Sequence, residues 1–110
     1  MASHASESEL VEKAVAGDRV AIQQLLMSHT SALTRFAASR LPKSVRDVVD
    51  PEDIVQQTFA QAFRSISGYR QQEGASFLSW LTAIAENKIM DTVKGLQREK
   101  RGGNRQRERV

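Results

Sequence analysis

The chain carries its clearest helix start at residues 50–59, which read Asp50-Pro51-Glu52-Asp53-Ile54-Val55-Gln56-Gln57-Thr58-Phe59. Asp50 is suited to the N-cap, and Pro51 to the first helical position, where no backbone N–H is needed. The acids that follow face the positive end of the helix dipole. These signals predict a helix from residue 51 to about residue 66. Its buried side should consist of Val55, Phe59, Ala62, Phe63 and Ile66.

The segments that precede this stretch are also helical in pattern. Ser6 should cap a short helix that ends at Gly17, and Asp18 should cap a long second helix that ends at Pro42. Residues 43–49 should form a linker. The long helix carries one buried stripe, whose members recur every three or four positions: Ile22, Leu25, Leu26, His29, Leu33, Phe36, Ala37 and Leu41.

The segments that follow it predict a polar loop and a last helix. The loop covers residues 69–75, and Ser76 should cap the helix. This helix should continue to about residue 101, although Gly95 costs about 1 kcal/mol relative to alanine, and Gly102-Gly103 should end it. It carries two adjoining apolar rows, one of Phe77, Trp80 and Ile84, the other of Leu78, Leu81, Ala85, Ile89, Val93 and Leu96.

The predicted fold is therefore all-α, a compact bundle of about four helices with a long C-terminal helical hairpin. We expect residues 1–103 to form one domain and residues 104–110 to form a disordered basic tail, the start of a linker to a second domain that is absent here. A chain of 110 residues suits a single hydrophobic core. With 40% hydrophobic and 26% charged residues, its composition is that of a globular protein.

Composition also restricts the compartment and the partners. There is no cysteine, so disulfides and thiolate metal sites are excluded. No apolar run reaches the roughly 18 residues of a membrane helix, and the acidic N-terminus is not a signal peptide. We therefore expect a soluble, cytoplasmic protein without a membrane span. Residues 88–110 contain eight Lys or Arg residues and three acids. Residues 1–87 also contain eight Lys or Arg residues, but ten acids. This asymmetry suggests a polyanionic partner, although a solvated tail explains the charge equally well.

Catalytic chemistry has few candidates in this sequence. His4 lies near the N-terminus, and His29 lies on a buried stripe, where a lone histidine is usually a core residue. Glu52 and Asp53 are adjacent on a helix and diverge by about 100°, which makes them a poor acid–base pair. There is no spacing typical of metal ligands and no glycine-rich phosphate loop. We expect no catalytic residue, no metal and no cofactor, and hence no enzyme.

Two segments together resemble the bacterial RNA polymerase sigma factors of the extracytoplasmic-function group. They are residues 50–59 and Phe77-x-x-Trp80-Leu81-x-x-Ile84-Ala85-x-Asn87, which occur in the order and spacing of that family's N-terminal domain, region 2. The resemblance covers about residues 8–102. Gln57 stands where the family has glutamate, and Gly95 where it has a second arginine. The chain stops where the family adds a linker and a second, promoter-reading domain.

The resemblance implies a promoter-melting domain that docks on the polymerase core. The family's docking helix binds the clamp helices of the β′ subunit, and the matching outward face here carries uncharged amides that cost little to desolvate. The candidate polymerase contacts carried over by position are Glu52, Asp53, Gln56, Gln57 and Thr58. An anti-sigma factor is a possible further partner.

The family's loop before the tryptophan helix receives an extruded base from the non-template strand of the minus-ten element, and basic residues on the helix follow the phosphates. The corresponding DNA-binding candidates are Tyr69, Arg70, Gln71, Ser76, Asn87, Lys88, Lys94, Arg98 and Arg101. Tyr69 could instead pack on the end of the hairpin. We expect Phe77 and Trp80 to be core residues, with Trp80 buried against the preceding helices.

Two other functions fit the same pattern. The domain could serve mainly as the target of an anti-sigma regulator, with little DNA binding of its own. It could also be an unrelated small helical nucleic-acid binder or a phosphoryl-transfer enzyme. Binding to core polymerase separates the first alternative from a promoter-melting domain.

Overall fold

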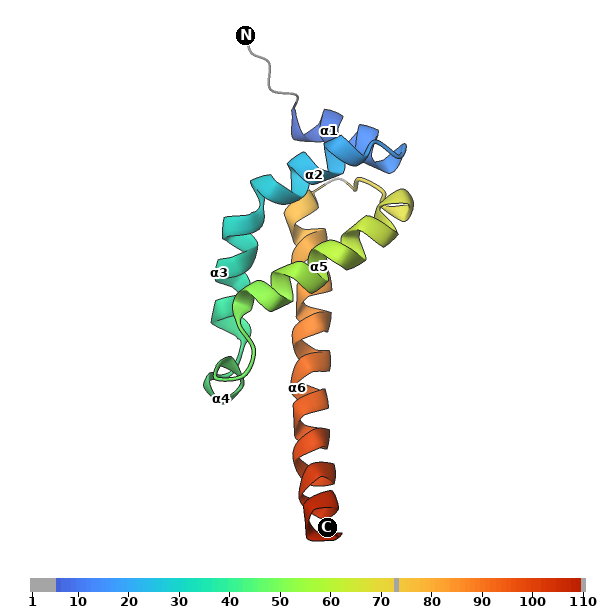
Figure 1. The fold of residues 1–110 in the computed structure, drawn as a ribbon. Helices are drawn as coiled ribbons and strands as arrows, with labels where there is room; N and C mark the ends of the chain where they lie inside the picture. The colour runs from blue at the N-terminus through green and yellow to red at the C-terminus, as the bar shows by residue number, and fades with distance from the viewer. Residues whose placement is uncertain (1–5, 73, 110) are drawn as a thin grey trace.

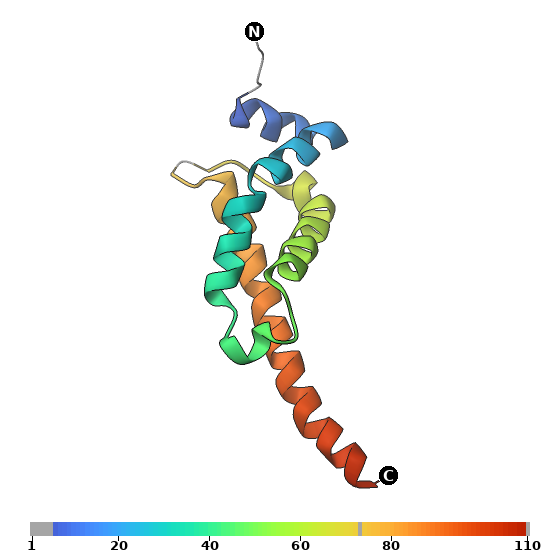
Figure 2. The same cartoon turned by 60° about the vertical axis from the view of Figure 1, so that its left-hand side comes forward.

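The computed structural model describes residues 6–72 and 74–109, with side-chain environments for 6–72 and 74–99. Its regular elements are all helical, which confirms the predicted fold class. They are α1 (Glu7–Val15), α2 (Arg19–Ser28), α3 (Thr30–Arg40), α4 (Lys43–Arg46), α5 (Pro51–Ser65), the 3-10 helix η1 (Ile66–Gly68) and α6 (Phe77–Arg109). Helix α5 crosses α6, and α3 packs against both (Figure 1). The C-terminal half of α6 projects beyond the other helices in both views (Figure 2).

The predicted helix starts are confirmed by the caps. Ser6 and Glu9 form a reciprocal box, in which the Glu9 N–H donates to Ser6 Oγ at 3.1 Å and the Ser6 N–H donates to Glu9 Oε1 at 3.0 Å. Asp18 Oδ1 accepts from two N–H groups of α2, at 3.0 and 3.1 Å. Ser76 Oγ accepts from the Ser79 N–H at 3.1 Å. Each cap satisfies N–H groups that have no partner within the helix.

Asp53, a predicted polymerase contact, also helps to cap the start of α5. Its Oδ2 accepts the backbone N–H of Asp50 at 3.1 Å, so this side chain reaches back over the first turn. Asp50 and Pro51 occupy the N-cap and first helical positions, as the sequence predicted. The carboxylate of Asp53 is therefore part of the cap, and its removal should also weaken the start of the helix.

The long helix predicted between Asp18 and Pro42 is wrong in one respect, because it is divided at His29. The backbone of His29 has φ −109° and ψ 6°, which separates α2 from α3. The hydroxyls of Ser28 and Thr30 donate to the carbonyl oxygens of Leu25 and Leu26, at 2.8 and 3.1 Å. Hydroxyls bonded back to helix carbonyls bend or weaken the ladder. The break allows α2 to pack against α1 while α3 packs against α5 and α6.

Two other boundaries differ from the prediction. Residues 43–46 form the short helix α4, with Val45 buried, where a plain linker was expected. Helix α6 continues past Gly102-Gly103 to Arg109. Each glycine costs about 1 kcal/mol in a helix but does not prevent one, and the Gln, Arg and Glu residues beyond them favour helix. Val110 and the side chains of residues 100–109 lie outside the description, and the division into a domain and a tail stays a prediction.

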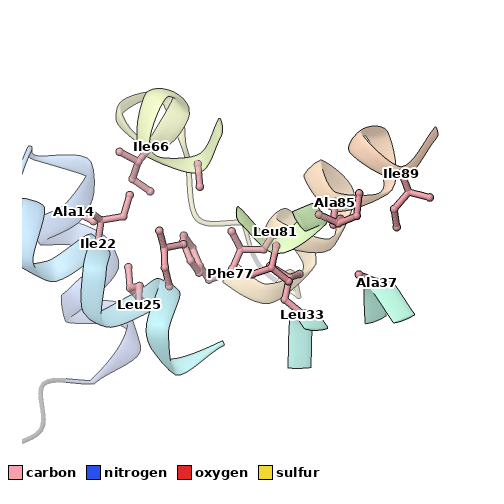
Figure 3. Close-up of a cluster of buried hydrophobic side chains, with 14 of the residues drawn as sticks. Ala14, Ile22, Leu25, Leu33, Ala37, Ile66, Phe77, Leu81, Ala85 and Ile89 are labelled. Atoms are coloured by element: carbon pink, nitrogen blue, oxygen red, sulfur yellow. The ribbon is translucent and has the colours of Figure 1, made fainter. Parts of the chain in front are cut away.

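The core draws on all six α-helices and is almost wholly apolar. Leu25, Leu33, Ile54 and Leu81 are fully buried, and Phe77 is only 2% exposed. Figure 3 shows Phe77 between Leu25 on one side and Leu81 and Leu33 on the other. At an outer edge, the exposed Arg40 donates to Glu86 Oε2 at 2.7 Å and links α3 to α6.

Phe63 was predicted to be buried and is instead 41% exposed. The buried side of α5 is centred on Ile54, Thr58 and Ala62, which follow one another at four-residue steps. Phe63 lies about 100° from Ala62 around the helix axis, at the edge of that side. Within the part of the chain that the structure describes, no helix combines the length and apolar character needed to cross a membrane.

Candidate functional site

The outward face of α5 carries four of the five residues predicted to contact polymerase. Glu52, Asp53, Gln56 and Gln57 are all exposed. Thr58 is the exception, because it is fully buried and its hydroxyl donates to the Ile54 carbonyl oxygen at 2.7 Å. Thr58 lies four residues after Ile54, on the core side of the helix, so its side chain cannot reach a partner. We therefore remove it from the predicted contacts.

A solvent-open hollow lies between the 69–76 loop and the first turn of α6. Its volume is about 350 Å³, and its lining residues are Gly68, Tyr69, Arg70, Gln72, Ala75, Ser76, Ser79 and Trp80. Gly74, with φ 80°, provides a left-handed backbone conformation within the loop. The predicted Tyr69, Arg70 and Ser76 thus come together. Gln71 is exposed but does not line the hollow, whereas its neighbour Gln72 does.

One wall of the hollow is aromatic. The ring centroids of Tyr69 and Trp80 lie 4.9 Å apart, and each ring lies 5.4 Å from the ring of Phe77. Phe77 is buried, as predicted, but Tyr69 and Trp80 are only partly buried. The predicted burial of Trp80 is confirmed only in part, because its ring packs against the core but stays partly exposed. Trp80 precedes the buried Leu81 by one position, about 100° around the helix axis, so its ring lies at the edge of the core, where it also lines the hollow.

The phenol of Tyr69 remains protonated over a wide pH range. Partial burial raises the pKa of Tyr69 above its ordinary value of 10.0, and the negative charge of Glu7 on α1 raises it further. Both effects disfavour the phenolate. At neutral pH, Tyr69 therefore presents a neutral ring and an O–H group that can donate or accept a hydrogen bond.

A second hollow, of about 460 Å³, lies between α5 and α6. Its lining residues are Gln61, Ile84, Asn87, Lys88, Met90, Asp91 and Lys94. Lys88 Nζ approaches Gln61 Oε1 at 3.5 Å across the two helices. Trp80, Ile84, Asn87, Asp91 and Lys94 recur at steps of three or four residues, so both hollows open on one side of α6.

The predicted DNA contacts on α6 divide between this hollow and the exposed helix beyond it. Asn87, Lys88 and Lys94 line the hollow, and Arg98 is exposed one turn further on. The side chain of Arg101 lies outside the described residues. Beyond the aromatic hollow, this side of α6 thus offers the amide of Asn87, the cations Lys88, Lys94 and Arg98, and one acid, Asp91.

Besides Gln72, sequence reasoning missed three residues that the structure brings to the site. Trp80 was assigned to the core, Gln61 was not singled out, and Glu7 was regarded only as an acidic residue of the N-terminus. No spacing rule relates Glu7 to Tyr69, because 61 intervening residues separate them. The only sequence signal was the placement of Trp80 on an apolar row that adjoins the main one.

Comparison with known proteins assigns the fold and the family. A solved structure of an engineered region 2 of sigmaE in complex with GTAAAA superposes with a TM-score of 0.72, at 22% identity, over 90% of this chain and 97% of that one. The sigma factor SigD of Mycobacterium bovis is 28% identical over 83% of this chain and 42% of its own length. BldN of Streptomyces coelicolor is 34% identical over 78% and 31%.

SigM of Mycobacterium tuberculosis is also 34% identical, over 81% of this chain and 42% of its own length. All three are named as extracytoplasmic-function RNA polymerase sigma factors, and this chain spans about two-fifths of their length or less. The sigma-70 region 2 family model matches residues 25–99. The match includes α5, the 69–76 loop and the described side of α6 that carries both hollows. The chain therefore belongs to the sigma-70 region 2 family.

Proposed function

We propose that this chain docks on the core of bacterial RNA polymerase through α5 and recognises the non-template strand of the minus-ten promoter element through the 69–76 loop and α6. The observation that carries the proposal is the aromatic hollow, which is open to solvent at the start of a helix that carries the exposed cations Lys94 and Arg98 further along. A docking helix and a base-binding hollow on one rigid unit would hold the promoter in a defined position relative to the polymerase.

The hollow has the chemistry that an extruded base requires. The ring of Trp80 is partly exposed, and the ring of Tyr69 lies 4.9 Å from it. Arg70, Gln72 and Ser76 add groups that donate and accept hydrogen bonds along a base edge. Stacking on an aromatic ring contributes about 1–3 kcal/mol per base and hydrogen bonds to the edge provide selectivity. The related region 2 structure contains the oligonucleotide GTAAAA, which supports this assignment.

The outward face of α5 supports docking on a protein. Gln56 and Gln57 are exposed next to Ala60, so that side of the helix is flat and uncharged in its middle. Amides pair with a partner at a smaller desolvation cost than charges do. The curated relatives are named as RNA polymerase sigma factors, which makes the polymerase core the expected partner. An anti-sigma regulator that covers the same face stays a prediction.

The decisive experiment combines core polymerase with this chain and a randomised single-stranded DNA library. The complex should form in a pull-down, and the bound strands should be enriched for one base at one or more positions. If polymerase is not retained, the docking proposal is wrong. If polymerase is retained but no position is enriched, the base-recognition proposal is wrong.

Replacing Tyr69 by alanine is expected to reduce the preference for the enriched strand over a scrambled strand. The loss should correspond to about 1–3 kcal/mol, the contribution of one base–aromatic stack. Fluorescence anisotropy of labelled strands measures both affinities. Ser67→Ala is the control, because Ser67 is exposed on η1 just before the loop, does not line the hollow and is not among the predicted DNA contacts. If the two variants prefer the enriched strand over the scrambled strand equally, Tyr69 does not contact the recognised base.

Replacing Lys94 or Arg98 by alanine is expected to weaken binding to every strand alike. Each cation that neutralises a phosphate contributes a slope of about −0.7 to the dependence of log affinity on log salt for single strands. Each substitution should therefore flatten that slope by about 0.7 without changing base preference. Titrations at several salt concentrations measure it, with Lys13→Ala on α1 as the control. If the salt slope of these variants equals that of Lys13→Ala, Lys94 and Arg98 do not contact the strand.

A further inference from the structure

Helix α1 lies outside the aromatic hollow, because none of its residues lines it. It packs against α2 and against η1, which directly precedes the loop. Glu7, in its first turn, reaches the break between α2 and α3, where Glu7 Oε1 lies 3.0 Å from His29 Nε2. The side chain of His29 is only 16% exposed, and that of Glu7 is 45% exposed. Among the described residues, the Glu7 carboxylate is thus the side-chain partner of the imidazole.

The imidazole is the first of four aromatic rings in contact. The ring of His29 lies 5.9 Å from that of Phe77, and Phe77 lies 5.4 Å from both Tyr69 and Trp80. Tyr69 and Trp80 are the rings that line the hollow. A continuous series of contacts therefore runs from a carboxylate on α1, through a histidine and a buried phenylalanine, to the two rings assigned to base stacking.

We propose that Glu7 and His29 are positioning residues for base recognition, which hold Phe77 and, through it, the rings of Tyr69 and Trp80 in the geometry that accepts a base. The inference rests on the proposed function of the hollow and assigns α1 a part in it. Neither Glu7 nor His29 lines the hollow, so neither is expected to contact the strand.

Stability alone does not explain this arrangement. Helix α1 already has its own capping box at Ser6 and Glu9, and it buries Val11 and Ala14 in the core. A partly exposed ion pair contributes about 0–1 kcal/mol to stability. Glu7 is also close enough to Tyr69 for its charge to raise the pKa of that phenol. The carboxylate therefore acts on the hollow as well as on His29.

The test uses the full chain with core polymerase and three variants. Glu7→Ala removes both the acceptor and the charge, and Glu7→Gln removes the charge but keeps an oxygen that can accept from His29. Glu12→Ala is the matched control, an exposed acid on the same helix. The probes are the strand enriched from a randomised hexamer library, the length of GTAAAA in the related structure, and a scrambled hexamer.

Glu7→Ala should lower the preference for the enriched strand by about 2–10-fold, the range for one hydrogen bond. Glu7→Gln should restore most of that preference, and Glu12→Ala should retain all of it. The chain has one tryptophan and one tyrosine, so two spectroscopic signals report on the hollow alone. The emission of Trp80 should change in Glu7→Ala. The pKa of Tyr69, followed by phenolate absorbance, should fall in both Glu7 variants and not in Glu12→Ala.

The outcomes separate this inference from the proposed function. If the unaltered chain does not distinguish the two strands, base recognition by the hollow is wrong, and the role of α1 in it is wrong too. If the unaltered chain distinguishes them and Glu7→Ala behaves like Glu12→Ala, only the inference about α1 is overturned. Denaturation curves for all variants establish that each is folded, and unchanged Trp80 emission in a folded Glu7→Ala protein would also contradict the inference.

Discussion

Replacing Phe77 by alanine is expected to lower the free energy of unfolding by about 3–5 kcal/mol. The side chain is 2% exposed and lies between Leu25, Leu33 and Leu81 (Figure 3). Its removal eliminates the transfer free energy of a whole ring and leaves a cavity where α2, α3 and α6 meet. Urea denaturation followed by circular dichroism measures the change.

Phe63→Ala is the matched control for that experiment. Phe63 is the same residue type, is also helical, and is 41% exposed. It should cost less than about 2 kcal/mol, because much of its ring is already in contact with water. Similar losses in the two variants would mean that Phe77 is not the central core residue that the structure shows.

The double substitution Gln56→Ala and Gln57→Ala is expected to weaken binding to core polymerase by about 1–4 kcal/mol, if these amides are central contacts. Both side chains are exposed on the outward face of α5, away from Ile54, Thr58 and Ala62. Their removal should leave the free energy of unfolding nearly unchanged. Biolayer interferometry with immobilised polymerase measures the affinity.

The control for this experiment is the pair Gln23→Ala and Gln24→Ala. These glutamines are also adjacent, helical and exposed, but they lie on α2. Asp53 is unsuitable as a test residue, because its carboxylate accepts the Asp50 N–H and its loss would disturb the helix start as well as the surface. Equal polymerase affinities for the two double variants would contradict docking through the α5 face.

In the proposed function, the arrangement of the site would divide DNA recognition into two tasks. The hollow bounded by Tyr69 and Trp80 offers stacking and edge contacts, which depend on the base. Lys94 and Arg98 lie further along α6 and offer charge, which does not. Because Trp80, Lys94 and Arg98 all lie on α6, their spacing along that helix is fixed, and in the proposed function a strand bound by the cations would reach the hollow in one register.

The sequence alone determined the fold class and the starts of α1, α2, α5 and α6. Caps such as those at Ser6, Asp18 and Ser76 are bonds between residues two or three positions apart, so local residue types decide them. Apolar residues at three- and four-residue steps likewise identified the helices and most of the core, including Leu25, Leu33 and Leu81. The exposed amides of α5 were also correctly assigned to the outward face.

The tertiary structure decided which aromatic rings meet solvent and what holds them. Periodicity identifies an apolar side of a helix but not where its edge falls, so Phe63 and Trp80 were assigned to the core, and Thr58 to the surface. The bond between Glu7 and His29 joins residues 22 positions apart, and the pair Arg40–Glu86 joins residues 46 apart. Such contacts depend on how helices pack after they form, because no local pattern brings distant residues together.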